Sequence, residues 1–557
     1  MTEFSNRYHA LNTAQKQAVD SIDGPLLVVA GPGTGKTELL SMRTANILQK
    51  TDTAPENILL LTFTESGANA MRERLAAIIG PAAYKVAINT FHGFGTEVIN
   101  QNREYFYNGA TYKPADEITS YELLEGIFDT LDYSSPIATK NQGEYVYLSD
   151  TARTISELKN AGLTSDELLQ VINENEAVYD AAEQELAAIF YNRISTAMLP
   201  QLVPIAERIA ALPQTNLPLG ITPMTNTLAL SMAHAFDQAV QTGKTTSITA
   251  WRNEWLEKDM DGTFVFKDRK RCVKLRAVAY VYYAYLSRMD ESGLYDYDDM
   301  ILNVIHAIET HPDLRANLQE KYQYILVDEF QDTNLAQLRL LFNIANDKQS
   351  NIMAVGDDDQ AIYSFQGADV NNIHKFRDYY NNPEIVVLTQ NYRSIPRVLV
   401  HAREVILQGN DRLESNIKEL SKELVATSKH DGHVAFHANT DVLAERAWIA
   451  EHIKSIITNG AKPENIAVVA RRHAELVALV PHLEQQGIAV NYERRDNVLD
   501  SPVVRDIVLI TSIIDALHSQ ALGDANALLP ELTALPALQY NAEDIWRLSL
   551  TSYNNRQ

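Results

Sequence analysis

A glycine-rich segment, residues 31–37, most constrains what this chain can fold into. Its sequence, GPGTGKT, follows the apolar run Leu26–Ala30 and precedes a helix-like stretch. Glycines let the backbone turn tightly and point its N–H groups at phosphate oxygens, and a following helix adds its positive end. The pattern G-x-x-x-x-G-K-[ST] between a strand and a helix is typical of a phosphate loop. We therefore expect this segment to bind a nucleotide; the alternative is a glycine-rich turn that binds nothing.

The residues of this loop have distinct expected roles. Lys36 would reach the β- and γ-phosphates of a nucleoside triphosphate, and Thr37 would hold Mg²⁺. The residues expected to form the phosphate cradle are Gly31, Pro32, Gly33, Thr34, Gly35, Lys36 and Thr37.

The composition is that of an ordinary soluble globular chain. Its 557 residues are 45% apolar and 22% charged, and such a length suggests about three or four domains. The one cysteine, Cys272, excludes an internal disulfide and a Cys-rich zinc site and favours the reducing cytoplasm. The N-terminus lacks the apolar core of a signal peptide, and no apolar run approaches the roughly 20 residues of a membrane span. We expect no membrane partner.

The net charge of −24 argues against a general affinity for nucleic acid, because phosphate binding needs a positive surface. It leaves room for a basic channel on an acidic body. A local basic cluster consists of Lys267, Arg269, Lys270, Arg271, Lys274 and Arg276. Such a cluster is either a solvated helix face or a binding surface, and both interpretations stay open.

Short apolar runs alternate with longer helix-like stretches, which is the signature of an α/β fold with a parallel sheet flanked by helices. The runs expected as strands are residues 26–30, 58–62, 86–89, 324–327, 352–355 and 385–388. Ligands in such folds bind at the carboxyl ends of the strands. Each polar cluster described below follows one of these runs, so we expect the clusters to share one site.

The pattern changes along the chain and predicts several domains. An α/β domain is expected from residues 1–100 and 290–383, with a helical insertion at 101–289. Part of a second α/β domain is expected at 384–505, with strands at 465–470 and 488–492. Another helical region is expected to begin within 506–557.

The first polar cluster, Asp328-Glu329, follows the run at 324–327. A carboxylate at a strand end can hold Mg²⁺ directly or through water, which suits Asp328. Glu329 would then polarise the water that attacks the γ-phosphate. An Asp-Glu pair alone is common on surfaces, so its pairing with the phosphate loop is what favours this interpretation.

Two further clusters follow the next strands. Three consecutive aspartates, residues 357–359, repel one another and need solvent, a cation or a structural partner. The next residue, Gln360, could sense the γ-phosphate through its amide; a solvated acidic turn is the alternative. After the run at 385–388, Arg393 could stabilise charge on the γ-phosphate and Tyr392 offers a flat face to an adenine ring.

Taken together, these segments resemble the motifs of superfamily 1 DNA helicases of the UvrD/Rep/PcrA type. In the family order they are LNTAQ (the Q motif), AGPGTGKT (I), TFTESGA (Ia), TFHGF (Ib), YDYDDM (the acidic motif before II), VDEFQDTN (II), VGDDDQAIYSFQGA (III) and LTQNYRS (IV). The resemblance covers about residues 8 to 100 and 290 to 510. It implies RecA-like P-loop NTPase domains 1A and 2A, a helical insertion 1B, and a helical region 2B.

The resemblance also implies residue roles. ATP and Mg²⁺ become the expected cofactors, with Gln15 as the adenine reader and Lys36, Glu329, Gln360 and Arg393 as catalytic residues. Single-stranded DNA would cross the tops of the RecA-like domains. The residues implied to contact it are Phe63, Tyr363 and Phe365, by stacking on bases, and Thr90 and His92, along the backbone. The alternative for each aromatic is a place in the core.

The chain departs from the family at three points. Phe365-Gln366 stands where relatives have Trp-Arg, and Glu38 stands where relatives often have Arg against the adenine. Motifs V and VI are not found before Gln557. We therefore expect a truncated or partner-completed chain that binds ATP but hydrolyses it and unwinds DNA poorly.

The leading hypothesis is an ATP-dependent 3′-to-5′ DNA helicase and translocase in repair, replication or recombination. Its expected partners are single-stranded DNA, single-strand/double-strand junctions, and repair or recombination proteins. One alternative is the motor of a RecB- or AddA-like helicase–nuclease, and another is an ATP-gated DNA-binding module. The carboxylate of Glu329 argues against the module, because simple binding has no use for water activation.

Overall fold

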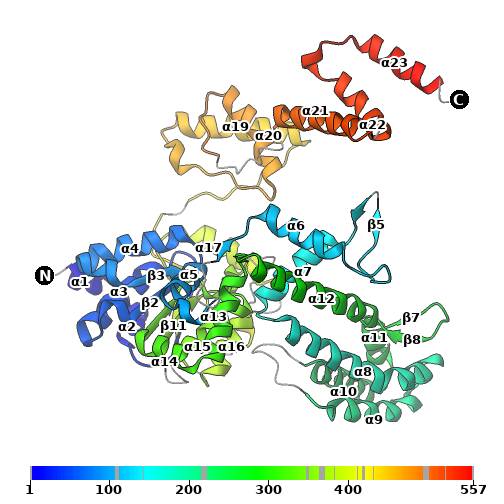
Figure 1. Cartoon of the computed structure of the whole chain (residues 1–557). Helices are drawn as coiled ribbons and strands as arrows, with labels where there is room; N and C mark the ends of the chain where they lie inside the picture. The colour runs from blue at the N-terminus through cyan, green and yellow to red at the C-terminus, as the bar shows by residue number, and fades with distance from the viewer. Residues whose placement is uncertain are drawn as a thin grey trace. The chain divides into compact units, whose positions relative to one another are not determined.

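The computed structural model describes residues 3–106, 112–141, 143–214, 223–345, 350–362, 371–381, 383–409, 412–416, 421–430, 432–492, 501–520 and 522–554. The chain divides into two compact units, residues 1–434 and 435–557. The first unit holds the central sheet and the helical insertion (Figure 1).

The centre of the first unit is a six-stranded sheet in which every pairing is parallel. In spatial order its strands are β12 (Glu384–Leu388), β1 (Leu26–Ala30), β11 (Asn351–Gly356), β10 (Tyr324–Val327), β2 (Ile58–Thr62) and β3 (Ala87–Thr90). These are the six expected strands, displaced by at most one residue at an end. The predicted α/β class with a parallel sheet flanked by helices is therefore confirmed.

Alternate side chains of each strand enter two separate cores, as the period of two in a pleated strand requires. In β1, Leu27 and Val29 pack into one core, and Leu26, Val28 and Ala30 pack into the other. The second core is covered by α1 (Glu3–Ala10), α2 (Thr13–Asp20), α3 (Lys36–Lys50) and α4 (Glu65–Ile79). The first is covered by α5 (Phe91–Gln101), α13 (Asp299–Thr310), α14 (Pro312–Lys321), α15 (Leu335–Ile344) and α16 (Asn371–Tyr379).

The expected insertion is built largely of helices around two apolar cores of its own. The helices are α6 (Glu117–Phe128), α7 (Leu148–Asn160), α8 (Ser165–Tyr191), α9 (Leu199–Ala210), α10 (Met224–Thr242), α11 (Thr246–Trp255) and α12 (Arg269–Glu291). Two short hairpins join them: β5 (Lys140–Asn141) with β6 (Glu144–Tyr145), and β7 (Leu256–Lys258) with β8 (Phe264–Phe266).

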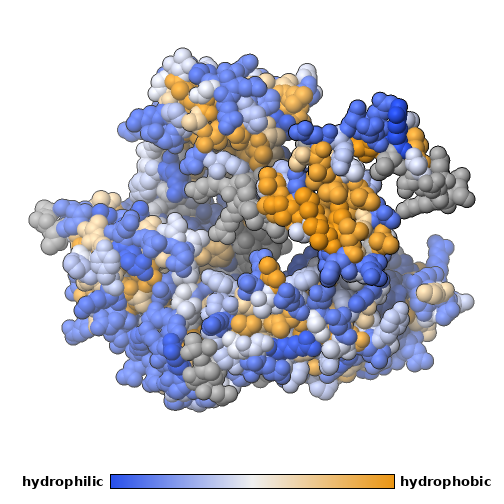
Figure 2. Space-filling view, turned by 45° about the horizontal axis from the view of Figure 1, so that its top comes forward, coloured by the Kyte–Doolittle hydropathy of each residue, from blue (hydrophilic) through white to orange (hydrophobic). Residues whose placement is uncertain are grey.

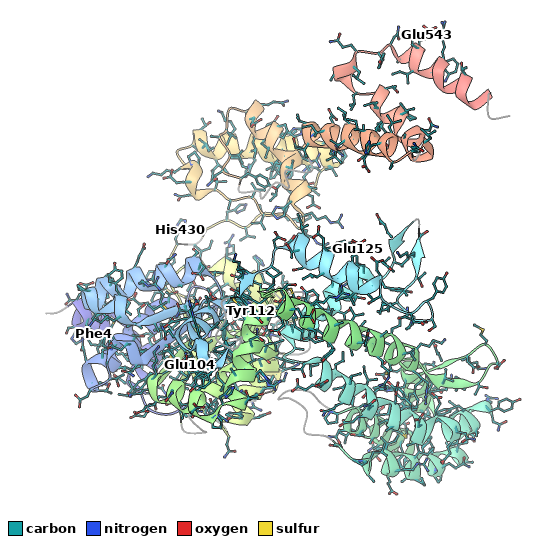
Figure 3. All side chains as sticks on the ribbon, in the orientation of Figure 1. Phe4, Glu104, Tyr112, Glu125, His430 and Glu543 are labelled. Atoms are coloured by element: carbon teal, nitrogen blue, oxygen red, sulfur yellow. The ribbon has the colours of Figure 1, made fainter. Side chains whose placement is uncertain are left out.

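The two ends of the insertion lie side by side. The strand β4 (Lys113–Pro114) pairs in parallel with β9 (Leu294–Tyr295). Beside this pair the hydroxyl of Tyr112 donates to Asp290 Oδ1 at 2.6 Å (Figure 3). The chain therefore leaves and re-enters the α/β core at one place.

A buried ion cluster joins the insertion to the segment before α13. The ammonium of Lys159, on α7, contacts the carboxylate of Asp296 and lies 2.7 Å from Asp299 Oδ1. The Lys159 side chain is fully buried, and the hydroxyl of Tyr285 also donates to Asp296, at 3.2 Å. Next to it on α7, Asn160 Oδ1 accepts from Asn334 Nδ2 at 2.8 Å.

The expected start of a second domain at residue 384 does not coincide with a break in the sheet. The segment Glu384–Leu388 pairs with β1 along its whole length, so it belongs to the first sheet. It is followed by β13 (Gln390–Asn391), α17 (Pro396–Ile406), α18 (Leu413–Asn416) and β14 (Val425–Ala426), all within the first unit. The sequence predicts this run both as a strand of the parallel sheet and as the start of a second domain. The pairing confirms the first, and the domain boundary stays a prediction.

The second unit, by itself, contains α19 (Val442–Thr458), α20 (His473–Gln485), α21 (Pro502–His518), α22 (Leu522–Thr533) and α23 (Ala542–Asn554). The strands predicted at 465–470 and 488–492 are wrong: neither segment is a strand in the structure. A short apolar run favours extended backbone, but a strand also needs a hydrogen-bonded neighbour. Val469 is 91% exposed, whereas Ile466 and Ile488 of these segments pack into the small core of the second unit.

Large apolar side chains are exposed on this second unit. Figure 2 shows hydrophobic residues gathered on its surface, and those of α21 include Val503, Ile507, Val508, Ile514 and Leu517. Among the helices that the structure describes, none is long and apolar enough to cross a membrane.

Candidate active site

The phosphate-loop candidate connects β1 to α3 and has the backbone of an anion cradle. Gly33 and Gly35 both adopt positive φ, 70° and 88°, and the hydroxyl of Thr34 closes the loop by donating to the carbonyl of Gly31 at 2.7 Å. Gly35 is the N-cap of α3 and offers no side chain to the first helical N–H groups. Those groups and the positive end of a 15-residue helix fit the phosphates of a nucleotide.

The expected catalytic pair is assembled at the ends of two strands. The ammonium of Lys36 forms a short ion pair with Glu329 Oε2, and Gln331 Nε2 donates to the same oxygen at 2.9 Å. Glu329 has a φ of 48°, in the left-handed region that is rare outside glycine. Such strain is held only where the surrounding contacts fix it, and it is typical of functional positions.

The candidate magnesium ligand, Asp328, is buried directly beside this pair. Burial, together with the neighbouring Glu329 charge and against the opposing Lys36 charge, raises the pKa of its carboxyl to about 6. Asp332 shows the same effect for the same reasons, and its Oδ1 has no hydrogen-bond partner among the described residues. Buried carboxylates with too little positive charge around them fit a divalent cation.

The structure also limits how such a cation would be held. In the described part of the chain, no group of three or more His, Cys, Asp or Glu side chains is arranged to hold a metal ion. Mg²⁺ commonly keeps its waters and uses one or two protein oxygens together with phosphate oxygens. Asp328 and Thr37 would supply those protein oxygens, so both remain proposed ligands.

Gln360 lies against the strand that leads into the loop. Its Nε2 donates to Asp357 Oδ2 at 2.7 Å and to the carbonyl of Ala30 at 3.4 Å. The backbone N–H of Asp357 in turn donates to Gln331 Oε1 at 3.0 Å. Gln331 therefore links Glu329 to the Gln360 turn, a role that sequence reasoning missed although the residue stands inside VDEFQDTN.

Gln15 and Tyr392 meet the other side of the loop. Gln15 Nε2 donates to the carbonyl of Thr34 at 3.0 Å, and its Oε1 accepts from the backbone of Asn12 at 3.1 Å. Asn12 Nδ2 then donates to the hydroxyl of Tyr392 at 3.0 Å. The two residues expected to contact adenine are thus connected through one asparagine, beside the loop.

The segment around Arg393 is attached to the loop by its neighbours. Asn391 Nδ2 donates to the carbonyl of Pro32 at 2.6 Å, and the backbone N–H of Tyr392 donates to the carbonyl of Gly33 at 2.9 Å. The Arg393 side chain is exposed. Asn391 is a second residue that sequence reasoning missed; its full burial is invisible in the sequence alone.

Because residues 391–393 approach the loop closely at Gly33, a substitution at Gly33 tests whether this contact matters for nucleotide binding. An added Cβ would lie 2.7 Å from Arg393 Cβ and 2.8 Å from Asn391 Nδ2, whereas at Gly24, which has a similar φ of 78°, nothing lies within 4 Å. Alanine is strained by about 1–2 kcal/mol at both positions. We expect Gly33→Ala to weaken Mg-ATP binding by about tenfold or more and Gly24→Ala to leave it nearly unchanged in equilibrium titrations. Equal effects would show that the approach of residues 391–393 is unimportant for the nucleotide.

The residues expected to contact DNA have different surroundings. Phe63 is half-buried just after β2. Thr90 is buried and already engaged: its hydroxyl accepts from Gly93 N–H at 3.0 Å, capping α5, and donates to Glu65 Oε1 at 2.9 Å. His92 packs against the exposed ring of Tyr297, with centroids 4.7 Å apart, and burial lowers its pKa. Tyr363 and Phe365 lie outside the described residues.

Other charged features noted in the sequence are explained by internal pairing. Glu38 lies 3.2 Å from Arg7 and 3.9 Å from Arg74. In the basic cluster on α12, Arg269 pairs with Asp180 and Glu183, Lys270 with Glu257, and Arg276 with Glu176. Half of the cluster's six cations are thus neutralised within the insertion, which favours the solvated helix face over a binding surface.

The chain matches two models of known protein families. The model of the UvrD/REP helicase N-terminal domain matches residues 11–381, and that of the UvrD-like helicase C-terminal domain matches residues 386–521. The ATP-dependent DNA helicase PcrA of Bacillus subtilis (strain 168) is 25% identical over 505 residues, covering 90% of this chain and 53% of its own length. The proteins of that name from Staphylococcus epidermidis and Staphylococcus aureus are each 24% identical, over 504 and 506 residues, covering 90% of this chain and 54% and 53% of their own lengths. The chain thus spans about half the length of these relatives.

Proposed function

Because the chain belongs to the UvrD/REP helicase family, we propose that it is an ATP-driven motor on single-stranded DNA. The observation that carries this is the ion pair between Lys36 and Glu329 at the ends of two strands of one parallel sheet. A loop lysine for phosphates and a carboxylate for water, held at one point, are what phosphoanhydride hydrolysis needs. A protein that only bound nucleotide would gain nothing from the strained Glu329.

We propose the following roles in the ATP cycle. The N–H groups of the loop and Lys36 bind and orient the phosphates, and Gln15 and Tyr392 contact the base. When bound, Mg²⁺ supplies positive charge to the phosphate oxygens. Glu329 takes a proton from the attacking water, and Arg393 stabilises charge on the γ-phosphate. Gln360 reports the γ-phosphate to the rest of the domain.

We propose that the DNA path crosses the sheet end where Phe63 and His92 lie. Tyr297, which packs on His92 and is 64% exposed, joins them there as an aromatic face that sequence reasoning missed. Stacking on such faces tolerates any base sequence, which suits a translocating enzyme. Direction 3′-to-5′, loading at single-strand/double-strand junctions, and service in DNA repair or recombination are carried over from the family and complete the proposal.

A single aromatic substitution tests the DNA path. Base stacking contributes about 1–3 kcal/mol per base, so Phe63→Ala is expected to weaken single-stranded DNA binding by about tenfold to a hundredfold. Binding is measured by fluorescence anisotropy with a labelled oligonucleotide, and Mg-ATP affinity should not change. The control is Tyr84→Ala, which removes an aromatic ring that is 70% exposed. Equal DNA affinity in both variants would place the path elsewhere.

A further inference from the structure

The three consecutive aspartates before Gln360 are not a solvated turn. The ammonium of Lys422 lies 2.5 Å from Asp357 Oδ1, 2.6 Å from Asp358 Oδ1 and 2.8 Å from Asp359 Oδ2. Arg412 adds a two-pronged contact to Asp359, with distances of 2.7 and 2.6 Å. The mutual repulsion of the three aspartates is thus offset by two cationic side chains from a later segment of the chain.

This cluster is removed from water. The side chains of Lys422, Asp357 and Asp358 are 5%, 3% and 3% exposed. Charges buried to this extent are stable only when they are paired in well-formed contacts, and removing one partner leaves an uncompensated charge. The position of Lys422 therefore dictates where the three carboxylates sit.

One of these carboxylates continues the chain of contacts into the site. Asp357 uses Oδ1 for Lys422 and Oδ2 to accept from Gln360 Nε2 at 2.7 Å. One N–H of the Gln360 amide is held by Asp357, which sets the orientation of the amide. The other makes only a long contact, 3.4 Å, with the Ala30 carbonyl, so it is the donor that a γ-phosphate would take over. Asp358 makes the same contact with Lys422, but its other oxygen accepts from the backbone of Leu413 at 2.7 Å.

The residues directly after Lys422 contact the phosphate loop and the segment before Arg393. A Cβ added at Gly31 would lie 2.9 Å from a methyl carbon of Leu424. Val425 and Ala426 pair with Gln390 and Asn391, and the backbone N–H of Thr427 donates to the Asn391 carbonyl at 2.8 Å. One short segment thus contacts the Gln360 turn, the loop and the residues before Arg393.

We propose that Lys422 is a positioning residue that holds the Gln360 amide toward the γ-phosphate through Asp357. The proposal rests on the proposed ATP site and adds to it a residue that touches no nucleotide. It explains why an ammonium is buried against three aspartates: the cluster makes the γ-phosphate sensor rigid. Arg412 holds Asp359, the last of the three aspartates.

The test is the discrimination between a non-hydrolysable Mg-ATP analogue and Mg-ADP, measured as the ratio of their dissociation constants. Gln360 faces only the γ-phosphate in this account, so Lys422→Met should lower the preference for the ATP analogue by about tenfold, the value of one well-placed hydrogen bond, with Mg-ADP affinity kept. Lys422→Arg should recover most of the preference. In a Gln360→Ala background, Lys422→Met should change the ratio no further.

Matched variants separate positioning from loss of structure. Asp358→Asn removes a carboxylate from the same buried cluster without touching Gln360, so it should keep the preference; Lys429→Met, at an exposed lysine, should do the same. If Lys422→Met unfolds the chain, Asp357→Asn takes its place and should lower the preference where Asp358→Asn does not. An unchanged ratio in Lys422→Met, or equal ratios for Asp357→Asn and Asp358→Asn, overturns the inference. Failure of the unmodified chain to bind either nucleotide would instead refute the proposed function.

Discussion

Replacing Glu329 by Gln is expected to lower single-stranded-DNA-stimulated ATP turnover by about 10²- to 10⁴-fold, the usual contribution of a positioned general base. The amide keeps the size of the side chain but cannot take a proton from water. Mg-ATP binding should persist, because the loop N–H groups and Lys36 are untouched. Steady-state phosphate release and equilibrium nucleotide titration, made on the same preparation, measure the two effects separately.

The control for this change is Glu73→Gln, which removes an exposed carboxylate on α4. It should leave both turnover and binding as they are. If Glu329→Gln also leaves turnover unchanged, the carboxylate is no base, and the ATP-gated binding module becomes the better account.

Removing Lys159 is expected to have the largest effect on stability. Lys159→Met leaves Asp296 and Asp299 buried without their cation, and breaking a buried pair in this way costs about 3–5 kcal/mol. The free energy of unfolding of the first unit, from urea denaturation followed by tryptophan fluorescence, should fall by that amount. The variant should also loosen the insertion from the α/β core, since Lys159 and Asn160 both hold the segments there.

Two control variants show whether the loss of stability comes from burying unpaired charge. Lys140→Met breaks an exposed ion pair with Asp129 and should have little effect, because water screens such pairs. The triple variant Lys159→Met, Asp296→Asn, Asp299→Asn removes all three charges and should recover part of the loss. A stability equal to that of the unmodified chain in Lys159→Met alone would contradict a role for the buried cluster.

Much of the fold could be predicted because its signals are local. Each strand is a short apolar run, and the phosphate loop is seven consecutive residues, 31–37, whose glycines serve a defined backbone shape. The carboxyl ends of parallel strands meet at one edge. That geometry alone predicts that Lys36, Asp328, Glu329 and Gln360 lie together.

What could not be predicted depends on contacts between distant parts of the chain. Lys422 meets Asp358 across 64 positions, and Arg412 meets Asp359 across 53; no local pattern marks such partners. The same holds for the pairing of Glu384–Leu388 with β1, because an apolar run predicts a strand but not the strand it pairs with. The expected strands at 465–470 and 488–492 are wrong because a short apolar run does not show whether a neighbouring strand is present to pair with it.

The hydrogen-bond partners of polar side chains also could not be predicted from the sequence. Thr90 is expected on the DNA path, and this stays a prediction; its hydroxyl caps α5 and bonds to Glu65, which the sequence does not show. No role is predicted from the sequence for Gln331 and Asn391, although their amides bond to Glu329 and to the loop. Side-chain amides bond in many directions, so their partners follow from the packing and not from spacing along the chain.

The measurement that tests the central claim most directly is ATP hydrolysis by this chain in Mg²⁺, with and without single-stranded DNA. We expect a turnover, whatever its absolute rate, that requires Mg²⁺ and rises when single-stranded DNA is added, since the proposed ATP site and the proposed DNA path lie at one end of the sheet. A turnover that ignores DNA, or Mg-ATP binding with no turnover at all, would contradict it.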